Sequence, residues 1–149
     1  MTSLQMPLTP KAMTVHATTL TLFVRGQWQG VLIMGPSGIG KSDLALRALD
    51  DGFQLVSDDY SHLWLSGHHL YARAPDTIAG QIEVRGIGVL PRPFRPLSRI
   101  SLCVHCQKTA PERLPEPEDI SFLGKSIPAL RLNPLEASTV SKLRMALGQ

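Results

Sequence analysis

The segment Gly-Pro-Ser-Gly-Ile-Gly-Lys-Ser at residues 35–42 constrains the fold more than any other part of the chain. It matches the pattern G-x-x-x-x-G-K-[ST], in which the backbone N–H groups of a glycine-rich loop surround phosphate oxygens. The apolar run VLIM precedes it, and a pattern that places Leu44, Ala45, Ala48 and Leu49 on one helical face follows it. The order predicts a strand, a phosphate-binding loop and a helix.

This loop predicts a nucleotide site that uses ATP and Mg²⁺. Lys41 is expected to bridge the terminal phosphates, and the Ser42 hydroxyl to ligate the magnesium ion that accompanies the nucleotide. The guanine-reading tetrapeptide N-K-x-D is absent from the sequence, which argues against a GTP switch. The motif alone does not separate a motor from a kinase. The predicted cofactor-binding residues are Gly35, Pro36, Ser37, Gly38, Ile39, Gly40, Lys41 and Ser42.

The rest of the chain reads as short strands separated by turns, with a helix at the end. This pattern predicts an α/β fold with mixed, partly antiparallel sheets. Residues 1–13 are polar and proline-containing and are expected to form a loose arm, followed by a single domain over 14–149. The expected strands are residues 18–24, 28–34, 53–57, a hairpin at 62–74, and 100–106; residues 79–99 are expected to be a loop or irregular strand, 109–119 a solvated excursion, and 133–148 a helix.

Composition limits the class of protein. A chain of 149 residues with 43% hydrophobic content supports one domain. Its formal charge of +3 lacks the clustered excess of a nucleic-acid binder, and no apolar run approaches the length that spans a membrane. With only two cysteines and no leader-like start, the chain is expected to be cytoplasmic, without nucleic-acid or membrane partners.

Two adjacent carboxylates, Asp58 and Asp59, follow the strand expected after the loop's helix. Phosphoryl transfer to a hydroxyl needs a carboxylate that orients the nucleophile and accepts its proton. Neighbouring side chains at a strand end point to opposite sides, so one aspartate is expected to face the phosphates while the other supports the metal or the loop. The alternative is that both are turn or capping residues.

Glu83 and Arg85 lie in the segment Q-I-E-V-R-G-I-G, where alternation along an extended chain puts both on one side. The carboxylate could ligate magnesium directly or through water, and the guanidinium could stabilise charge on the transferring phosphoryl group. A surface ion pair on a loop is the competing interpretation.

Taken in order, GPSGIGKS, LVSDD and IEVRGIGV resemble the kinase domain of the HPr kinase/phosphorylase family. The resemblance implies a P-loop fold of the phosphoenolpyruvate-carboxykinase-like type, assembly as a hexamer, and ATP-dependent phosphorylation of a serine in the phosphocarrier protein HPr. It also implies the reverse reaction, in which inorganic phosphate removes that phosphate and pyrophosphate forms. Typical members carry a further N-terminal domain for which 149 residues leave no room.

The resemblance also implies roles for individual residues. Asp59 would be the proton acceptor for the seryl hydroxyl and, in reverse, the proton donor. His16 matches a family histidine that precedes the loop, and Arg131 follows the Ile127-Pro128 pair in a segment associated mainly with dephosphorylation. The predicted catalytic set is Asp59, Lys41, His16, Arg85 and Arg131, and the predicted metal set is Ser42, Glu83 and Asp58.

Two other functions remain open on the sequence. A small-metabolite kinase would begin with the same loop, helix and acidic strand end, and a nucleotide-binding regulatory module could keep the loop without turnover. The arginine- and proline-rich residues 91–99 are either a solvated basic loop or a docking surface for an acidic or phosphorylated protein.

Overall fold

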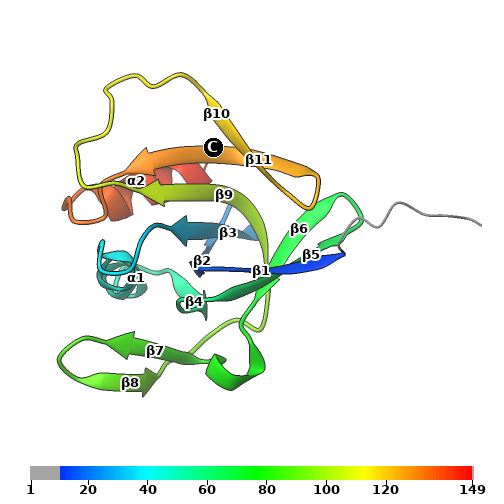
Figure 1. Ribbon diagram of the computed structural model, residues 1–149, viewed down its shortest axis with the longest axis vertical. Helices are drawn as coiled ribbons and strands as arrows, with labels where there is room; N and C mark the ends of the chain where they lie inside the picture. Colours follow the sequence, from blue (N-terminus) through cyan, green and yellow to red (C-terminus); the bar gives the residue numbers. More distant parts are fainter. Residues whose placement is uncertain (1–10, 149) are drawn as a thin grey trace, which may run out of the picture.

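The structure, a computed structural model, describes residues 11–148 (Figure 1). Strands alternate with turns along most of this length, and a helix follows the phosphate-loop motif. The strands are β1 (Ala12–Val15), β2 (Ala17–Val24), β3 (Gln27–Met34), β4 (Gln54–Ser57), β5 (Ser61–Ser66), β6 (His69–Arg73), β7 (Gln81–Val84), β8 (Gly88–Pro91), β9 (Ser98–Cys106), β10 (Glu118–Phe122) and β11 (Lys125–Leu132). The helices are α1 (Lys41–Leu49), α2 (Thr139–Leu147) and a 3-10 turn, η1 (Asp76–Ile78).

A mixed sheet of nine strands forms the body of the described region, which confirms the predicted α/β class with partly antiparallel sheets. The order is β1-β5-β6-β9-β3-β2-β4, and β11 with β10 extends from the second half of β9. The pairs β3–β9 and β9–β11 are parallel, whereas β2 is antiparallel to both β3 and β4. The strands β3, β4, β9 and β11 therefore all end at the same edge of the sheet.

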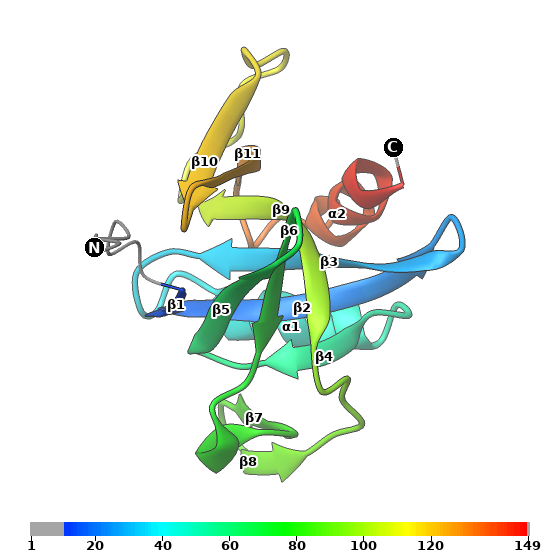
Figure 2. The same ribbon diagram turned by 90° about the vertical axis from the view of Figure 1, so that its right-hand side faces the viewer.

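The sheet is strongly curled and encloses a core on each face (Figure 2). Helices α1 and α2 cover one face, where Leu20, Ile33, Leu44 and Leu143 are fully buried. The curl itself encloses the other face, on which Leu32 and Leu63 pack together with residues of β6, β9, β10 and β11. Amphipathic strands and helices bury their apolar sides in this way, which leaves the polar loops at the strand ends.

Close packing between β3 and β9 depends on Gly30. A Cβ at this position would lie 2.5 Å from the backbone oxygen of Arg99 and 2.8 Å from Ile100 Cδ1. The register between the two strands also shifts at Gly30. The glycine therefore lets the bend of β9 approach the central hairpin, because any side chain would separate the two backbones.

Residues 81–91 form a regular hairpin, where a loop or irregular strand was expected. Strands β7 and β8 pair in register from Gln81 with Pro91 to Val84 with Gly88, as a separate two-stranded sheet. Ile82 and Val84 are buried against the core below α1, which anchors one face of the hairpin. The glycines permit the turn, since Gly86 has φ +90° and Gly88 has φ +123°.

The two ends of the chain differ in part from the expectation. Strand β1 begins at Ala12 and pairs with β5, inside the segment expected to be a loose arm, while residues 1–10 lie outside the described residues. The last helix begins at Thr139 and not at residue 133. Asn133 Oδ1 instead accepts the N–H of Leu135 at 2.9 Å, which closes a turn, and Leu135 is 66% exposed.

The hairpin of β10 and β11 was not expected, since residues 109–119 were interpreted as a solvated excursion and no strand was assigned after them. The stretch before Glu118 has no regular structure, in agreement with its three prolines. Strand β11 then pairs in parallel with β9, from Ala129 with Cys103 to Leu132 with Cys106. This pairing carries Arg131 to the edge of the sheet at which β3 ends.

Candidate active site

A cavity of about 480 Å³ lies at the edge where β3 and β4 end. Three separate segments line it: residues 37–43 of the loop and first turn of α1, Asp59 after β4, and residues 83–85 at the end of β7 and directly after it. Leu46 and Leu135 complete the wall. The sequence predicted that these three segments meet, and the structure brings them together.

The loop has the backbone that the glycine motif predicts. Gly38 and Gly40 have φ +84° and +117°, in the left-handed region that favours glycine. A Cβ on Gly40 would also lie 2.8 Å from Leu135 Cδ2, so this glycine is needed for packing as well as conformation. Ile39 is buried in the core below α1 and anchors the loop. The result is a turn whose N–H groups precede the N-terminus of a helix, which is a favourable arrangement for an anion.

Lys41 is buried with 6% of its surface exposed. Its ammonium donates hydrogen bonds to the carbonyl oxygens of Gly35, at 2.5 Å, and Pro36, at 3.1 Å. Residues 37–42 line the cavity directly, whereas Gly35 and Pro36 contribute these two carbonyls from the start of the loop. The lysine charge is thus held inside the loop, next to the side chain of Ser42.

Asp59 and His16 form a hydrogen-bonded pair at the mouth of the cavity. His16 Nε2 lies 2.7 Å from Asp59 Oδ1, and the imidazole ring stacks on Tyr60 with a centroid distance of 4.9 Å. Asp59 has φ +70°, and its N–H donates to Thr18 Oγ1 at 3.0 Å. An aspartate tolerates this left-handed backbone, which turns its carboxylate out of the strand and toward the cavity.

Asp58 points the other way and does not line the cavity. Its Oδ1 accepts from the Thr18 hydroxyl at 3.3 Å, and its Oδ2 accepts the backbone N–H of Glu83 at 3.0 Å. Burial raises the pKa of Asp58, while these two hydrogen bonds act in the opposite direction. Asp58 therefore ties β7 to the end of β4, and its role as a metal ligand stays a prediction.

Glu83 in β7 and Arg85 directly after it are both exposed and both line the cavity, as the alternation predicted. Glu83 and Ser42 both line the cavity, so a carboxylate and a hydroxyl, both suitable ligands for Mg²⁺, belong to one site. Within residues 11–148, no three His, Cys, Asp or Glu side chains cluster as a metal centre would require. A bound ion would therefore depend on nucleotide oxygens in addition to Ser42 and Glu83.

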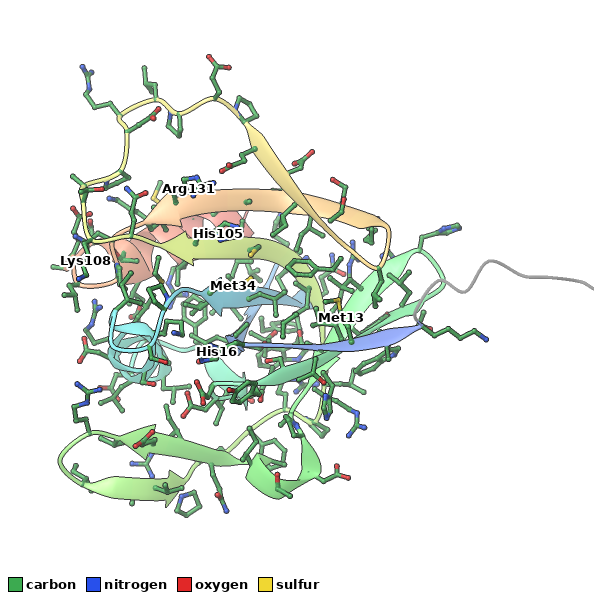
Figure 3. The ribbon with its side chains drawn as sticks, viewed as in Figure 1. Met13, His16, Met34, His105, Lys108 and Arg131 are labelled. Carbon is green, nitrogen blue, oxygen red and sulfur yellow. The ribbon has the colours of Figure 1, made fainter. Side chains whose placement is uncertain are left out.

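Arg131 lies outside the cavity. Its guanidinium donates two hydrogen bonds to Glu118, at 3.1 and 2.8 Å. Figure 3 shows Arg131 near the same edge of the sheet as His105 and Met34. The hydrogen bonds raise the pKa of Arg131 and lower that of Glu118. The structure thus places Arg131 apart from the other four residues of the predicted catalytic set.

Thr18, Tyr60 and Leu135 belong to the site but were not identified from the sequence. Thr18 bonds to both aspartates, yet in the sequence it is one of several β-branched residues of a strand. Tyr60 stacks on His16, and its position directly after the aspartate pair was the available signal. Leu135 falls within the range expected to form the last helix, although it lies against Gly40.

The glycine-rich loop, Asp59 and the segment at Glu83 together form a phosphate-binding site with carboxylates beside it, which is the kind of site a phosphate-transferring protein uses. Comparison with known proteins makes this specific: the family described as HPr Serine kinase C-terminal domain matches residues 9–133. The chain belongs to this family.

Curated relatives agree with the family. The chain is 35% identical over 116 residues to the HPr kinase/phosphorylase of Halalkalibacterium halodurans. The aligned region covers 69% of this chain and 37% of that protein. It is 50% identical over 62 residues to the HPr kinase/phosphorylase of Alkaliphilus metalliredigens, covering 41% of this chain and 20% of the relative. The matches thus span well under half the length of these relatives and correspond to their C-terminal kinase domain.

A solved structure shares the fold. The Hpr(Ser) kinase/phosphatase from Coxiella burnetii superposes with a TM-score of 0.72 at 27% sequence identity, over 91% of this chain and 87% of that one. In the part of the chain that the structure describes, no helix is long and apolar enough to cross a membrane.

Proposed function

We propose that this chain is an ATP- and Mg²⁺-dependent protein kinase that phosphorylates a serine of the phosphocarrier protein HPr. The observation that carries the proposal is the meeting, in one cavity, of Lys41 and Ser42 with Asp59 and with Glu83. A family whose curated members are named HPr kinase/phosphorylase supplies the acceptor.

The loop would hold the nucleotide. Its N–H groups and the start of α1 favour the phosphates, and the Lys41 ammonium is close enough to exchange its carbonyl partners for phosphate oxygens. Ser42 and Glu83 would hold the magnesium ion, which supplies charge neutralisation on the phosphates when it is bound. Arg85, which follows the strand of Glu83, would stabilise charge on the transferring group.

Asp59 would accept the proton. In the transfer, the seryl oxygen bonds to the γ-phosphorus, the bond between that phosphorus and the β–γ bridging oxygen breaks, and the seryl proton passes to the Asp59 carboxylate as ADP leaves. His16 contacts Asp59 Oδ1 at 2.7 Å and so fixes the carboxylate, leaving its second oxygen for the acceptor. Asp58 keeps Glu83 in place through the backbone N–H and acts as a positioning residue.

The reverse reaction would use the same groups, with Asp59 returning the proton to the departing serine while inorganic phosphate is the acceptor and pyrophosphate forms. Arg131 is part of this proposal through family resemblance, and its pairing with Glu118 leaves it outside the cavity. Assembly as a hexamer and a cytoplasmic location also stay predictions.

The experiment is incubation of the purified chain with MgATP and HPr, with mass spectrometry to locate the added phosphate. Phosphate on one serine supports the proposal. Transfer to a small metabolite but not to HPr would support the metabolite-kinase alternative, and nucleotide binding without any transfer would support a regulatory module.

A further inference from the structure

A row of side chains crosses three parallel strands next to the cavity. Met34 of β3 pairs with His105 of β9, and His105 pairs with Arg131 of β11. Residues paired across neighbouring strands point to the same face, and strands lie about 4.8 Å apart, so the row extends over about 10 Å. Figure 3 labels Met34, His105 and Arg131 one above the other on β3, β9 and β11.

The row begins where the catalytic pair stands. Ala17 of β2 pairs with Met34, and the residue directly before it is His16, which contacts Asp59. Asp59 lines the cavity, whereas Met34 and His105 do not. A molecule whose hydroxyl reaches Asp59 from outside the cavity would therefore lie over this row.

The row is apolar at its β3 end, where Met34 lies next to the catalytic pair, and a cation, Lys108, follows β9. Met34 is half-buried against the core inside the curl, and its thioether is a flexible surface that adapts to a partner. Lys108 is exposed, and no carboxylate among residues 11–148 lies within ion-pair distance of its ammonium. Glu118 of β10, which lies beside the row, is already bound by Arg131.

We propose that Met34, His105 and Lys108 are the docking surface for the protein that presents its serine to Asp59. The inference rests on the proposed kinase function. The partner is a folded protein whose serine adjoins an apolar patch bordered by carboxylates, because that surface complements the Met34 thioether and the Lys108 ammonium. A small metabolite would fit within the cavity and would not extend along the row.

The test compares Lys108→Glu and Met34→Asp with matched controls at the opposite end of the β2–β3 hairpin, Arg25→Glu and Phe23→Asp. Phe23 is 57% exposed, and Lys108 is exposed with no carboxylate at ion-pair distance to lose, so neither change should prevent folding. Each docking variant is expected to raise the KM for HPr about tenfold, since it places a negative charge opposite an acidic border. The KM for MgATP and the controls should change less than about twofold.

Binding of HPr is measured separately by calorimetry, in the presence of a non-hydrolysable ATP analogue, so that docking and catalysis are distinguished. If the wild type phosphorylates HPr and Lys108→Glu keeps its KM and affinity, the docking surface is wrong while the kinase function stands. If the wild type binds HPr without transfer, the kinase function fails, and weaker binding by the variants still supports the surface. If the wild type neither binds HPr nor phosphorylates it, both the docking surface and the kinase function are overturned.

Discussion

Replacing Asp58 by alanine would remove the acceptor of two buried hydrogen bonds beside the cavity. The Thr18 hydroxyl donates to Asp58 at 3.3 Å and the Glu83 N–H at 3.0 Å. A buried donor left without an acceptor costs about 1–3 kcal/mol, and the hydroxyl can rotate whereas the backbone N–H cannot. We therefore expect the free energy of unfolding to fall by about 2–3 kcal/mol, measured by urea denaturation.

Asp58→Asn is the matched control. Its amide oxygen can accept the Glu83 N–H and its NH₂ can donate to Thr18 Oγ1, so it should lose under about 1 kcal/mol. The pH dependence gives a second measure. Because burial raises the folded-state pKa of Asp58 above 3.8, the folded state binds more protons between the two values. This contribution to stability is full below pH 3.8 and is lost as the pH rises through the folded-state pKa. As the pH rises through this range, the free energy of unfolding of Asp58→Asn should therefore increase relative to that of wild type.

Magnesium dependence decides between this account and the role predicted from the sequence. If Asp58 only positions β7, Asp58→Asn should leave the Mg²⁺ concentration for half-maximal activity within about twofold of wild type. An unchanged unfolding free energy for Asp58→Ala, together with a roughly tenfold higher Mg²⁺ requirement for Asp58→Asn, would refute the reasoning and return Asp58 to the metal site.

Three further changes test other parts of the structure. Asp59→Asn should lower the rate of serine phosphorylation by roughly 100-fold or more with ATP affinity almost unchanged, and a near wild-type rate would exclude the base role. Lys41→Ala should abolish ATP binding in calorimetric titration; melting is measured alongside, because the lysine also bonds to two loop carbonyls. Gly30→Ala should lower the unfolding free energy by about 1–3 kcal/mol in urea through contact with the Arg99 oxygen, with Gly67→Ala, which has open space around it, as the milder comparison.

The parts of the site that local sequence determines were predicted correctly. The glycine motif between an apolar run and an amphipathic run specifies strand, loop and helix, and α1 begins at Lys41 as expected. Alternation placed Glu83 and Arg85 on one side, and the structure has both facing the cavity. The opposite directions of Asp58 and Asp59 also followed from their adjacency, although which of the two was buried depended on a hydrogen bond to β7.

The parts that long-range contacts determine could not be predicted. The hairpin of β7 and β8 is rich in glycine, which resembles a loop until Ile82 and Val84 are packed below α1. The last helix was expected from residue 133, but Asn133 closes a turn whose Leu135 contacts the phosphate loop. Arg131 reaches the edge of the sheet only because β11 pairs in parallel with β9, and no local pattern encodes that pairing.

The common direction of four strands explains why the cavity and the proposed docking surface are neighbours. Because β3, β4, β9 and β11 end at one edge, their last residues and following loops supply Lys41, Asp59, His105 and Arg131 within a few strand spacings. The opposite edge carries the β2–β3 turn and contributes no residue to the cavity. A nucleotide held by the loop after β3 would thus have its terminal phosphate directed toward Asp59, and an acceptor lying across β3 and β9 would approach the same carboxylate from the other side. The nucleotide and the acceptor would thus meet at this edge of the sheet while contacting different parts of the protein surface.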